Sequence, residues 1–192
     1  AVLLLDEPLS ALDTTTRLTT RRLLADTAVT TVVVTHDPID ARVLADRVAV
    51  LDAGAVTQRG TPDEVAAHPA SPWVARLLGV NLVAGVAAGA AVTTAEGDVL
   101  HLAESAAGPV WVVFEPNAVV IHTERPSGSS RNVWRATVAE VVLEGDRVRL
   151  VLDRPDEVTA LVTREALEEL AIRPGSQVWA ALKATELSTR PR

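Results

Sequence analysis

The chain begins with two apolar runs that each end in polar residues. Residues 2–5 are uninterrupted Val and Leu and lead into Asp6 and Glu7, while residues 31–35 are β-branched throughout and lead into His36. Continuous apolar runs of this length are typical of buried strands in a parallel sheet. Helical spacing between and after the runs predicts an α/β fold, in which strand tips meet at the edge where ligands bind.

The segments that follow these strands carry helix and turn signals. The helix expected over residues 14–25 has its arginines on a solvated face, namely Arg17, Arg21 and Arg22. Thr61, Pro62 and Glu64 form a helix start with a capping box. The other elements expected in this part are a helix over 38–45, a β-hairpin over 47–59 and a helical segment over 71–79.

From Val80 onward, short β-rich runs separated by Gly, Pro and Asp replace the alternation of strand and helix. Many short strands with turn residues between them predict an all-β, OB-like barrel. We place the boundary near residues 79–81. The expected strands cover 82–86, 90–94, 98–102, 110–114, 118–122, 133–143, 146–152, 157–162 and 177–183, with one helix at about 164–170.

Composition narrows the functional classes. Hydrophobic residues make up 48% of the chain, which is enough for a globular core, and there is no Cys for a disulfide or thiolate metal site. The net charge of −7 argues against a general nucleic-acid binder, since phosphate neutralisation needs clustered cations. Of the 18 basic residues only Lys183 is a lysine, which singles out that position. The apolar stretch 82–92 is too short to cross a bilayer.

Three polar residues at the strand tips suit phosphate chemistry. An acid at a strand tip, here Asp6, can hold Mg²⁺, usually through water. Glu7 faces the opposite side of the strand and can orient an attacking water, because successive side chains alternate. His36 at the tip of the second strand could contact a terminal phosphate or the same water.

The segment 3–13, followed by Val34-Thr35-His36-Asp37, resembles the Walker B motif, D-loop and switch histidine of ABC transporter ATPases. Residues 45–48 and 60–65 resemble importer-type members. The resemblance implies that residues 1–79 are the C-terminal part of a P-loop NTPase domain that uses ATP and Mg²⁺. The roles it implies are Mg²⁺ ligation by Asp6, catalysis by Glu7, γ-phosphate sensing by His36, dimer communication by Asp13, and nucleotide binding by Ser10, Asp13 and His36.

The sequence contains no G-x-x-x-x-G-K-[ST] loop to cradle phosphates. In the resembling family that loop, the glutamine loop and the signature helix lie upstream of the Walker B motif. Backbone N–H groups and the loop lysine supply most of the phosphate binding. We therefore expect that this chain alone does not hydrolyse ATP.

The last part of the chain holds a second group of candidate donors. A tetrahedral dianion needs several convergent hydrogen-bond donors and at least one cation. The hydroxyl of Ser129, the side chains of Arg131 and Lys183, and N–H groups at the helix start near Thr163 could supply them. The sequence thus predicts an oxyanion site within residues 129–192.

This order resembles the molybdate- and tungstate-binding Mop, or TOBE, module over residues 129–188. The resemblance implies a site shared between copies, hence a homodimer through both the ATPase and the β domains. Residues 80–128 resemble a degenerate first half and linker with no comparable set of donors, in which Glu115-Pro116-Asn117-Ala118 stands where family members also carry polar turns. The positions that match the oxyanion-binding residues are Ser129, Arg131, Asn132, Thr163, Lys183 and Ala184.

Three interpretations remain open from the sequence. The first is the C-terminal part of a molybdate or tungstate ABC importer ATPase with an oxyanion-sensing domain, peripheral on the cytoplasmic face of the membrane and partnered by a permease. The second is a stand-alone oxyanion-binding module whose α/β segment is vestigial. The third is an ATPase for sulfate, sugar or polyamine import whose β domain binds no metal oxyanion.

Overall fold

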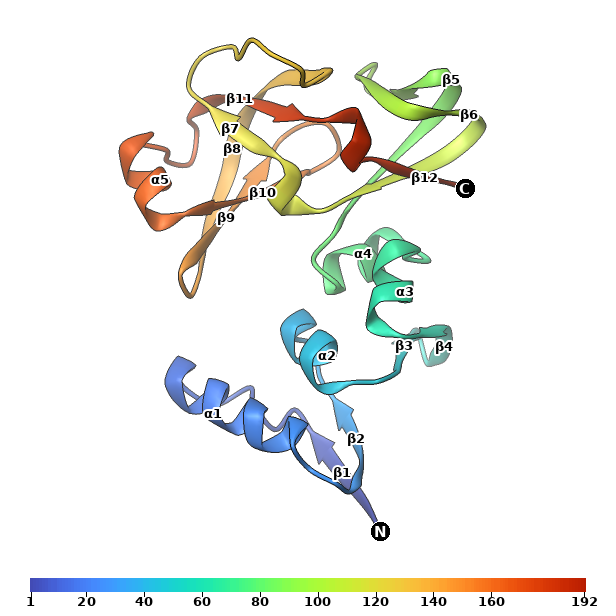
Figure 1. Cartoon of the computed structure of the whole chain (residues 1–192), viewed down its shortest axis with the longest axis vertical. Coiled ribbons are helices and arrows are strands. Elements are labelled where there is room, and N and C mark those ends of the chain that lie inside the picture. The colour runs from blue at the N-terminus through green and yellow to red at the C-terminus, as the bar shows by residue number, and fades with distance from the viewer. The chain divides into compact units, whose positions relative to one another are not determined.

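The computed structural model describes all 192 residues apart from the side chains of Thr14 and Pro38. The chain forms two compact units, Ala1–Gly79 and Val80–Arg192 (Figure 1). None of the described helices is long and apolar enough to span a membrane. Each unit has its own hydrogen-bonded sheets and is described by itself.

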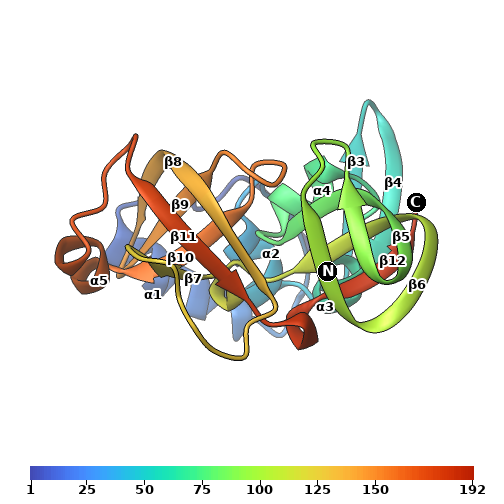
Figure 2. The same cartoon turned by 90° about the horizontal axis from the view of Figure 1, so that it is seen from above.

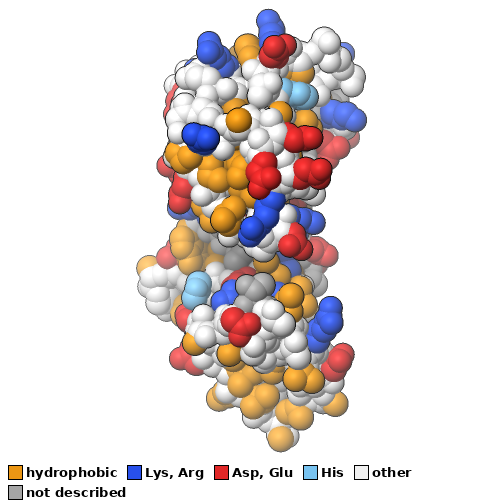
Figure 3. Space-filling view, turned by 90° about the vertical axis from the view of Figure 1, so that its left-hand side faces the viewer, with side chains coloured by type: hydrophobic (Ala, Val, Ile, Leu, Met, Phe, Trp, Pro, Cys, Tyr) orange, Lys and Arg blue, Asp and Glu red, His pale blue; other side chains and the backbone are white. Residues whose placement is uncertain are grey.

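Unit 1 contains the predicted parallel strand pair. β1 (Val2–Asp6) pairs with β2 (Thr30–Val34), and Leu4 lies opposite Val32. The expectation that these strands are buried is wrong for this chain, because Leu4 is 74% and Val32 51% exposed. In the described chain the sheet has only these two strands, so little covers its second face. Hydrophobic side chains accordingly gather at the end of unit 1 that carries the N-terminus (Figure 3).

The helices after these strands start where the sequence indicates. α1 (Thr14–Ala25) is capped by Asp13, and α2 (Pro38–Leu44) by Asp37 with Pro38 in its first turn. The expectation that Arg21 lies on a solvated face is wrong, since it is 7% exposed. Its guanidinium instead forms an ion pair with Asp40, a buried residue of α2.

The rest of unit 1 follows the local signals closely. β3 (Val48–Asp52) and β4 (Ala55–Gly60) form the expected hairpin. α3 (Pro62–Ala67) begins with the predicted capping box, in which Thr61 and Glu64 bond each other's backbone N–H groups at 3.1 and 2.8 Å. α4 (Pro72–Leu77) completes the unit.

Unit 2 is mostly β-structure with fewer and longer strands than the sequence predicts. β5 (Asn81–Thr94) and β6 (Val99–Phe114) replace the four short strands expected between residues 82 and 114. The predicted break near residue 89 is a bulge, because Gly89 has a φ of 66° and the ladder resumes after it. β5, β6 and the C-terminal β12 (Ser188–Pro191) form a three-stranded sheet.

A five-stranded sheet forms the remainder of unit 2, with the strand order β10-β9-β8-β11-β7. Buried residues of both sheets make one core that includes Val112, Val138 and Leu150, all fully buried. The elements not yet given are η1 (Pro116–Ala118), β7 (Val120–His122), β8 (Asn132–Glu144), β9 (Arg147–Leu152), β10 (Thr159–Thr163), α5 (Arg164–Glu169), β11 (Gln177–Leu182) and η2 (Ala184–Glu186).

The two halves of unit 2 exchange their last strands. β7 of the first half pairs with β11 of the second, while β12 of the second half pairs with β6 of the first. In each half a 3₁₀ turn precedes the exchanged strand. Each half also has a tryptophan with an arginine over its ring. Arg192 lies 5.0 Å from the ring centroid of Trp111 on β6, and Arg125 lies 5.5 Å from that of Trp179 on β11. The exchange places a strand of each half in the sheet of the other half (Figure 2).

Candidate functional sites

The tip of β1 brings Glu7 and His36 together. Glu7 Oε1 lies 3.0 Å from His36 Nδ1, and the Glu7 N–H donates to the carbonyl of Val34 at 2.9 Å. Both side chains are exposed, with 46% and 73% of their surfaces accessible to solvent. Glu7 has a φ of 43°, a left-handed conformation that is strained for a residue with a side chain and that concentrates at functional sites.

Ser10 and Asp13 both bond the backbone of their own segment. Ser10 Oγ donates to the Glu7 carbonyl at 2.9 Å and so fixes the turn that follows the strand. Asp13 Oδ1 accepts from the N–H groups of Thr16 and Thr15 at 3.1 and 3.0 Å, which caps α1. Hydrogen bonds from Thr16 and then Thr15 hold the pKa of Asp13 below its ordinary value of 3.8.

The lowered pKa of Asp13 predicts acid sensitivity at the start of α1. A carboxyl group with a lowered folded-state pKa stabilises the fold at pH values above its unfolded value of 3.8, and the contribution is lost as the pH falls through the folded value. The amides of Thr15 and Thr16 should therefore lose hydrogen-exchange protection in this acidic range. Asp13→Ala should remove that pH dependence. Asp26→Ala is the control, because the Asp26 side chain does not cap the helix, and equal loss in both variants would contradict the prediction.

Asp6 fits a role as one ligand of a magnesium ion. Its carboxylate is exposed at the tip of β1, next to the Glu7–His36 pair. No group of three or more His, Cys, Asp or Glu side chains is arranged for a metal among the described residues. Mg²⁺ is commonly held by one or two carboxylates together with substrate phosphates and water, so a single carboxylate is chemically consistent with it.

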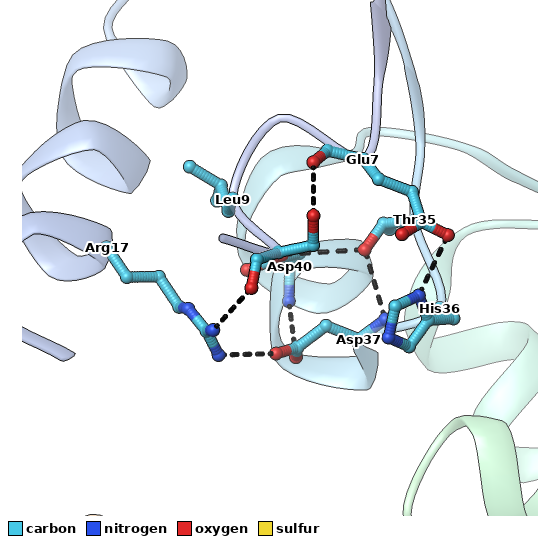
Figure 4. Close-up of a pocket in the computed structure, with 8 residues that line it drawn as sticks. Glu7, Leu9, Arg17, Thr35, His36, Asp37 and Asp40 are labelled. Carbon is cyan, nitrogen blue, oxygen red and sulfur yellow. Dashed lines mark hydrogen bonds and ion pairs between the residues drawn. The ribbon is translucent and has the colours of Figure 1, made fainter. Parts of the chain in front are cut away.

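A small polar pocket lies beside the Glu7–His36 pair (Figure 4). The sequence interpretation missed four of its residues and placed Arg17 on a solvated face. A signal was present, because Arg17 and Arg21 are one helical turn apart and Asp37 and Asp40 are similarly spaced. The residues that line the pocket are Glu7, Leu9, Ser10, Arg17, Thr35, His36, Asp37 and Asp40.

In unit 2, the cationic candidates leave the sheet at one end. Asn132 is paired with Leu182 at the end of the β8–β11 ladder. Arg131 directly precedes Asn132 and Lys183 directly follows Leu182, so the two cations emerge from the same end of neighbouring strands. Both are exposed. Ser129 lies two residues before Arg131, and Ala184 opens η2 directly after Lys183.

Asn132 has a structural role that the sequence did not predict. It is 2% exposed, and its amide spans the backbone of His101 on β6. Oδ1 accepts from the His101 N–H at 2.6 Å, and Nδ2 donates to the His101 carbonyl at 3.0 Å. Asn132 therefore joins the two halves of unit 2, and its side chain does not point at an exposed anion site.

Thr163 lies far from Lys183 along the sheet. It is paired with Arg147 on β9, which is paired with Glu144 at the end of β8 opposite Asn132. The twelve residue steps along β8 from Asn132 to Glu144 correspond to about 40 Å in a fully extended strand. α5, which Thr163 caps by accepting from Ala166 N at 3.1 Å, and η2 accordingly lie at different ends of the sheet (Figure 1). One copy of the chain does not bring all six predicted residues to one anion.

The first half of unit 2 carries the opposite charge at the equivalent turn. Glu115 precedes η1 with φ and ψ of −78° and 144°, and Lys183 precedes η2 with −74° and 143°. The two turns thus have the same backbone conformation, but the first half has the carboxylate of Glu115 where the second half has the ammonium group of Lys183. This substitution opposes anion binding at the first half.

Comparisons with known proteins match both parts of the chain. The TOBE domain family matches residues 128–188. The molybdenum import ATP-binding protein ModC of Mycobacterium tuberculosis is 38% identical over 204 residues, which cover 99% of this chain and 55% of that protein. The sulfate/thiosulfate import ATP-binding protein CysA of Thermosynechococcus vestitus is 36% identical, with 99% and 53% coverage. The chain thus spans about half the length of these curated relatives.

Two further similarities concern molybdate. The molybdate/tungstate import ATP-binding protein WtpC of Pyrococcus horikoshii is 34% identical over 99% of this chain and 56% of that protein. The solved structure of the cytoplasmic molybdate-binding protein ModG has a TM-score of 0.50 and 23% identity, covering 58% of this chain and 96% of that one. At that identity the structural likeness shows the fold alone.

Proposed function

We propose that this chain, which is similar to ABC import ATP-binding proteins and matches the TOBE domain over residues 128–188, is the C-terminal part of the ATP-hydrolysing subunit of a molybdate or tungstate importer. In this proposal unit 1 supplies part of the nucleotide site and unit 2 senses the intracellular oxyanion. The whole protein is a homodimer that works on a membrane permease, at the cytoplasmic face of the membrane. The observation that carries the oxyanion assignment is the emergence of Arg131 and Lys183 from one end of the β8–β11 ladder.

Residues of unit 1 divide the work of ATP hydrolysis. Asp6 holds Mg²⁺, which neutralises charge that develops on the phosphates. Glu7 orients the attacking water, while the contact between Glu7 Oε1 and His36 Nδ1 fixes both side chains at the strand tips. His36 is exposed and so is accessible to a terminal phosphate. The 192 residues contain no G-x-x-x-x-G-K-[ST] phosphate loop, so ATP hydrolysis by this chain alone is not expected.

The oxyanion site is shared between two copies in this proposal. Ser129, Arg131 and Lys183 come from one copy, and the start of α5 at Thr163 comes from the other. The separation of Thr163 from Lys183 along the sheet supports this division. Two cations offset the charge of the dianion, and hydroxyl and backbone donors complete its hydrogen bonds.

Titration of the 192-residue chain with molybdate, tungstate and sulfate tests the oxyanion assignment by calorimetry. Binding of molybdate is expected, and the double variant Ser129→Ala, Lys183→Ala should weaken it about a hundredfold or more, since hydrogen bonds to charged groups are strong. The matched control is Ser127→Ala with Arg173→Ala, which removes an exposed hydroxyl and an exposed cation elsewhere. Absence of heat and of a thermal shift at millimolar molybdate would contradict the assignment.

Sulfate import is the second candidate function. It is favoured by the similarity to the sulfate/thiosulfate import protein CysA, which covers as much of this chain as the similarity to ModC does. In that case sulfate or no anion would bind to unit 2. The same titration therefore separates the two candidates.

A further inference from the structure

Arg17 of α1 contacts the loop after β1 and the segment after β2, and both contribute residues to the unit 1 pocket. Its Nη2 donates to the carbonyl groups of Ser10 at 3.4 Å and Leu12 at 3.3 Å. Its Nη1 lies 3.6 Å from Asp37 Oδ2. The guanidinium thus joins the loop that follows β1 to the residue directly after His36.

These contacts close a ring around the pocket (Figure 4). Ser10 Oγ donates to the Glu7 carbonyl at 2.9 Å, and the Glu7 carboxylate contacts His36 at 3.0 Å. Asp37 follows His36 in the chain and leads back through Arg17 to Ser10. Among the side chains that the structure describes, Arg17 is the only one that links Asp37 to Ser10.

Asp37 is hydrogen-bonded to residues on both sides of it in the chain. Its Oδ1 caps α2 by accepting from the N–H groups of Ile39 at 2.7 Å and Asp40 at 3.3 Å. Its own N–H donates to Thr35 Oγ1 at 3.0 Å. The contacts of Asp37 thus span the turn from Thr35 to the start of α2, and His36 lies inside this turn.

We propose that Arg17 is a positioning residue that couples the loop of residues 10–13 to His36. When the loop shifts, the two carbonyl contacts move the guanidinium, and the guanidinium moves Asp37 and the histidine beside it. The planar fork of Arg can bridge three acceptors in fixed directions, which a lysine ammonium cannot do. The use of this coupling in the ATP cycle rests on the proposed function, but the coupling itself does not.

The proposal is tested by measuring whether a substitution in the loop of residues 10–13 changes the environment of His36. The full 192-residue chain carries Asp13→Ala as the perturbation, and the shift that it causes in the His36 imidazole resonances is recorded by NMR. The same perturbation is then measured in the Arg17→Lys and Arg17→Gln backgrounds. Arg22→Lys is the matched control, because Arg22 lies on the same helix and is exposed.

The expected result is a perturbation at His36 that is at least about twofold smaller in both Arg17 backgrounds and unchanged with Arg22→Lys, as in a double-mutant cycle. An undiminished effect in Arg17→Lys would show that charge alone suffices and would overturn the proposal. Loss of amide dispersion for residues 1–79 in both Arg17 variants would make Arg17 a folding residue and also reject it. No nucleotide or anion is added, so the outcome is independent of the molybdate titration.

Discussion

Asp40→Ala is expected to destabilise unit 1 by about 3–5 kcal/mol, because it leaves the Arg21 cation buried without its partner. Arg21 Nε donates to Asp40 Oδ1 at 2.7 Å and its Nη2 also contacts that oxygen, while the two side chains are only 9% and 6% exposed. Asp37 lies 4.0 Å from Arg21 Nη2, which is too far for a hydrogen bond to replace the lost one. Urea unfolding followed through backbone amides of residues 1–79 measures the change.

The double variant Arg21→Met, Asp40→Leu provides the control for this prediction. Replacing both members of a buried ion pair by apolar residues of similar size is often neutral or stabilising, whereas removal of one member is costly. The double variant should therefore be more stable than Asp40→Ala alone. The single variants Arg21→Met and Asp40→Leu complete the cycle. If their changes in the free energy of unfolding simply added up in the double variant, Arg21 and Asp40 would not be coupled and the ion pair would not hold α1 against α2.

The sequence predicted interactions between residues that are close in the chain and missed interactions between residues that are far apart. The capping box of Thr61 and Glu64 spans three residues and depends on local geometry alone, so it was predicted and is present. The contact of Arg21 with Asp40 spans 19 residues and depends on how two helices pack. Charged residues are usually exposed, and that expectation fails where a partner from another element removes the cost of burial.

At the candidate sites, too, local features were predicted correctly and features that depend on neighbouring elements were not. The apolar runs 2–5 and 31–35 predicted two strands of a parallel sheet, and the parallel pairing of β1 with β2 confirms them. The strands themselves are more exposed than expected, since exposure depends on what lies beside them. In unit 2, Gly89 signalled a break but supplies a bulge, because glycine permits a positive φ without ending the ladder.

Asn132 shows why a residue type in a matching position does not fix its role. The resemblance placed it among the anion-binding residues, yet its amide joins β8 to the His101 backbone across 31 residues of sequence. Asn81 in the first half bonds the backbone of the second half in the same way. Its amide donates to the Thr159 carbonyl at 2.9 Å and accepts from the Thr159 N–H at 2.7 Å. The two asparagines each open the first strand of a half and bond the other half.

Asn132→Ala is accordingly expected to destabilise unit 2 by about 2–4 kcal/mol, because it leaves a donor and an acceptor of His101 without partners. Asn81→Ala should have a similar effect through Thr159. The free energy of unfolding, measured in urea through the amides of residues 80–192, tests both variants. The control is Asn117→Ala, since Asn117 is exposed and substitutions at such positions change stability by about 0.5 kcal/mol or less.

The same variant separates a structural asparagine from an anion ligand. If Asn132 acts only by joining the halves, the folded fraction of Asn132→Ala should bind molybdate with nearly the affinity of the unmodified chain. The Lys183→Ala variant should behave in the opposite way, with its stability kept and its affinity lost. A stable Asn132→Ala protein that has lost molybdate binding would place the amide at the anion and contradict the role derived from its contacts with His101.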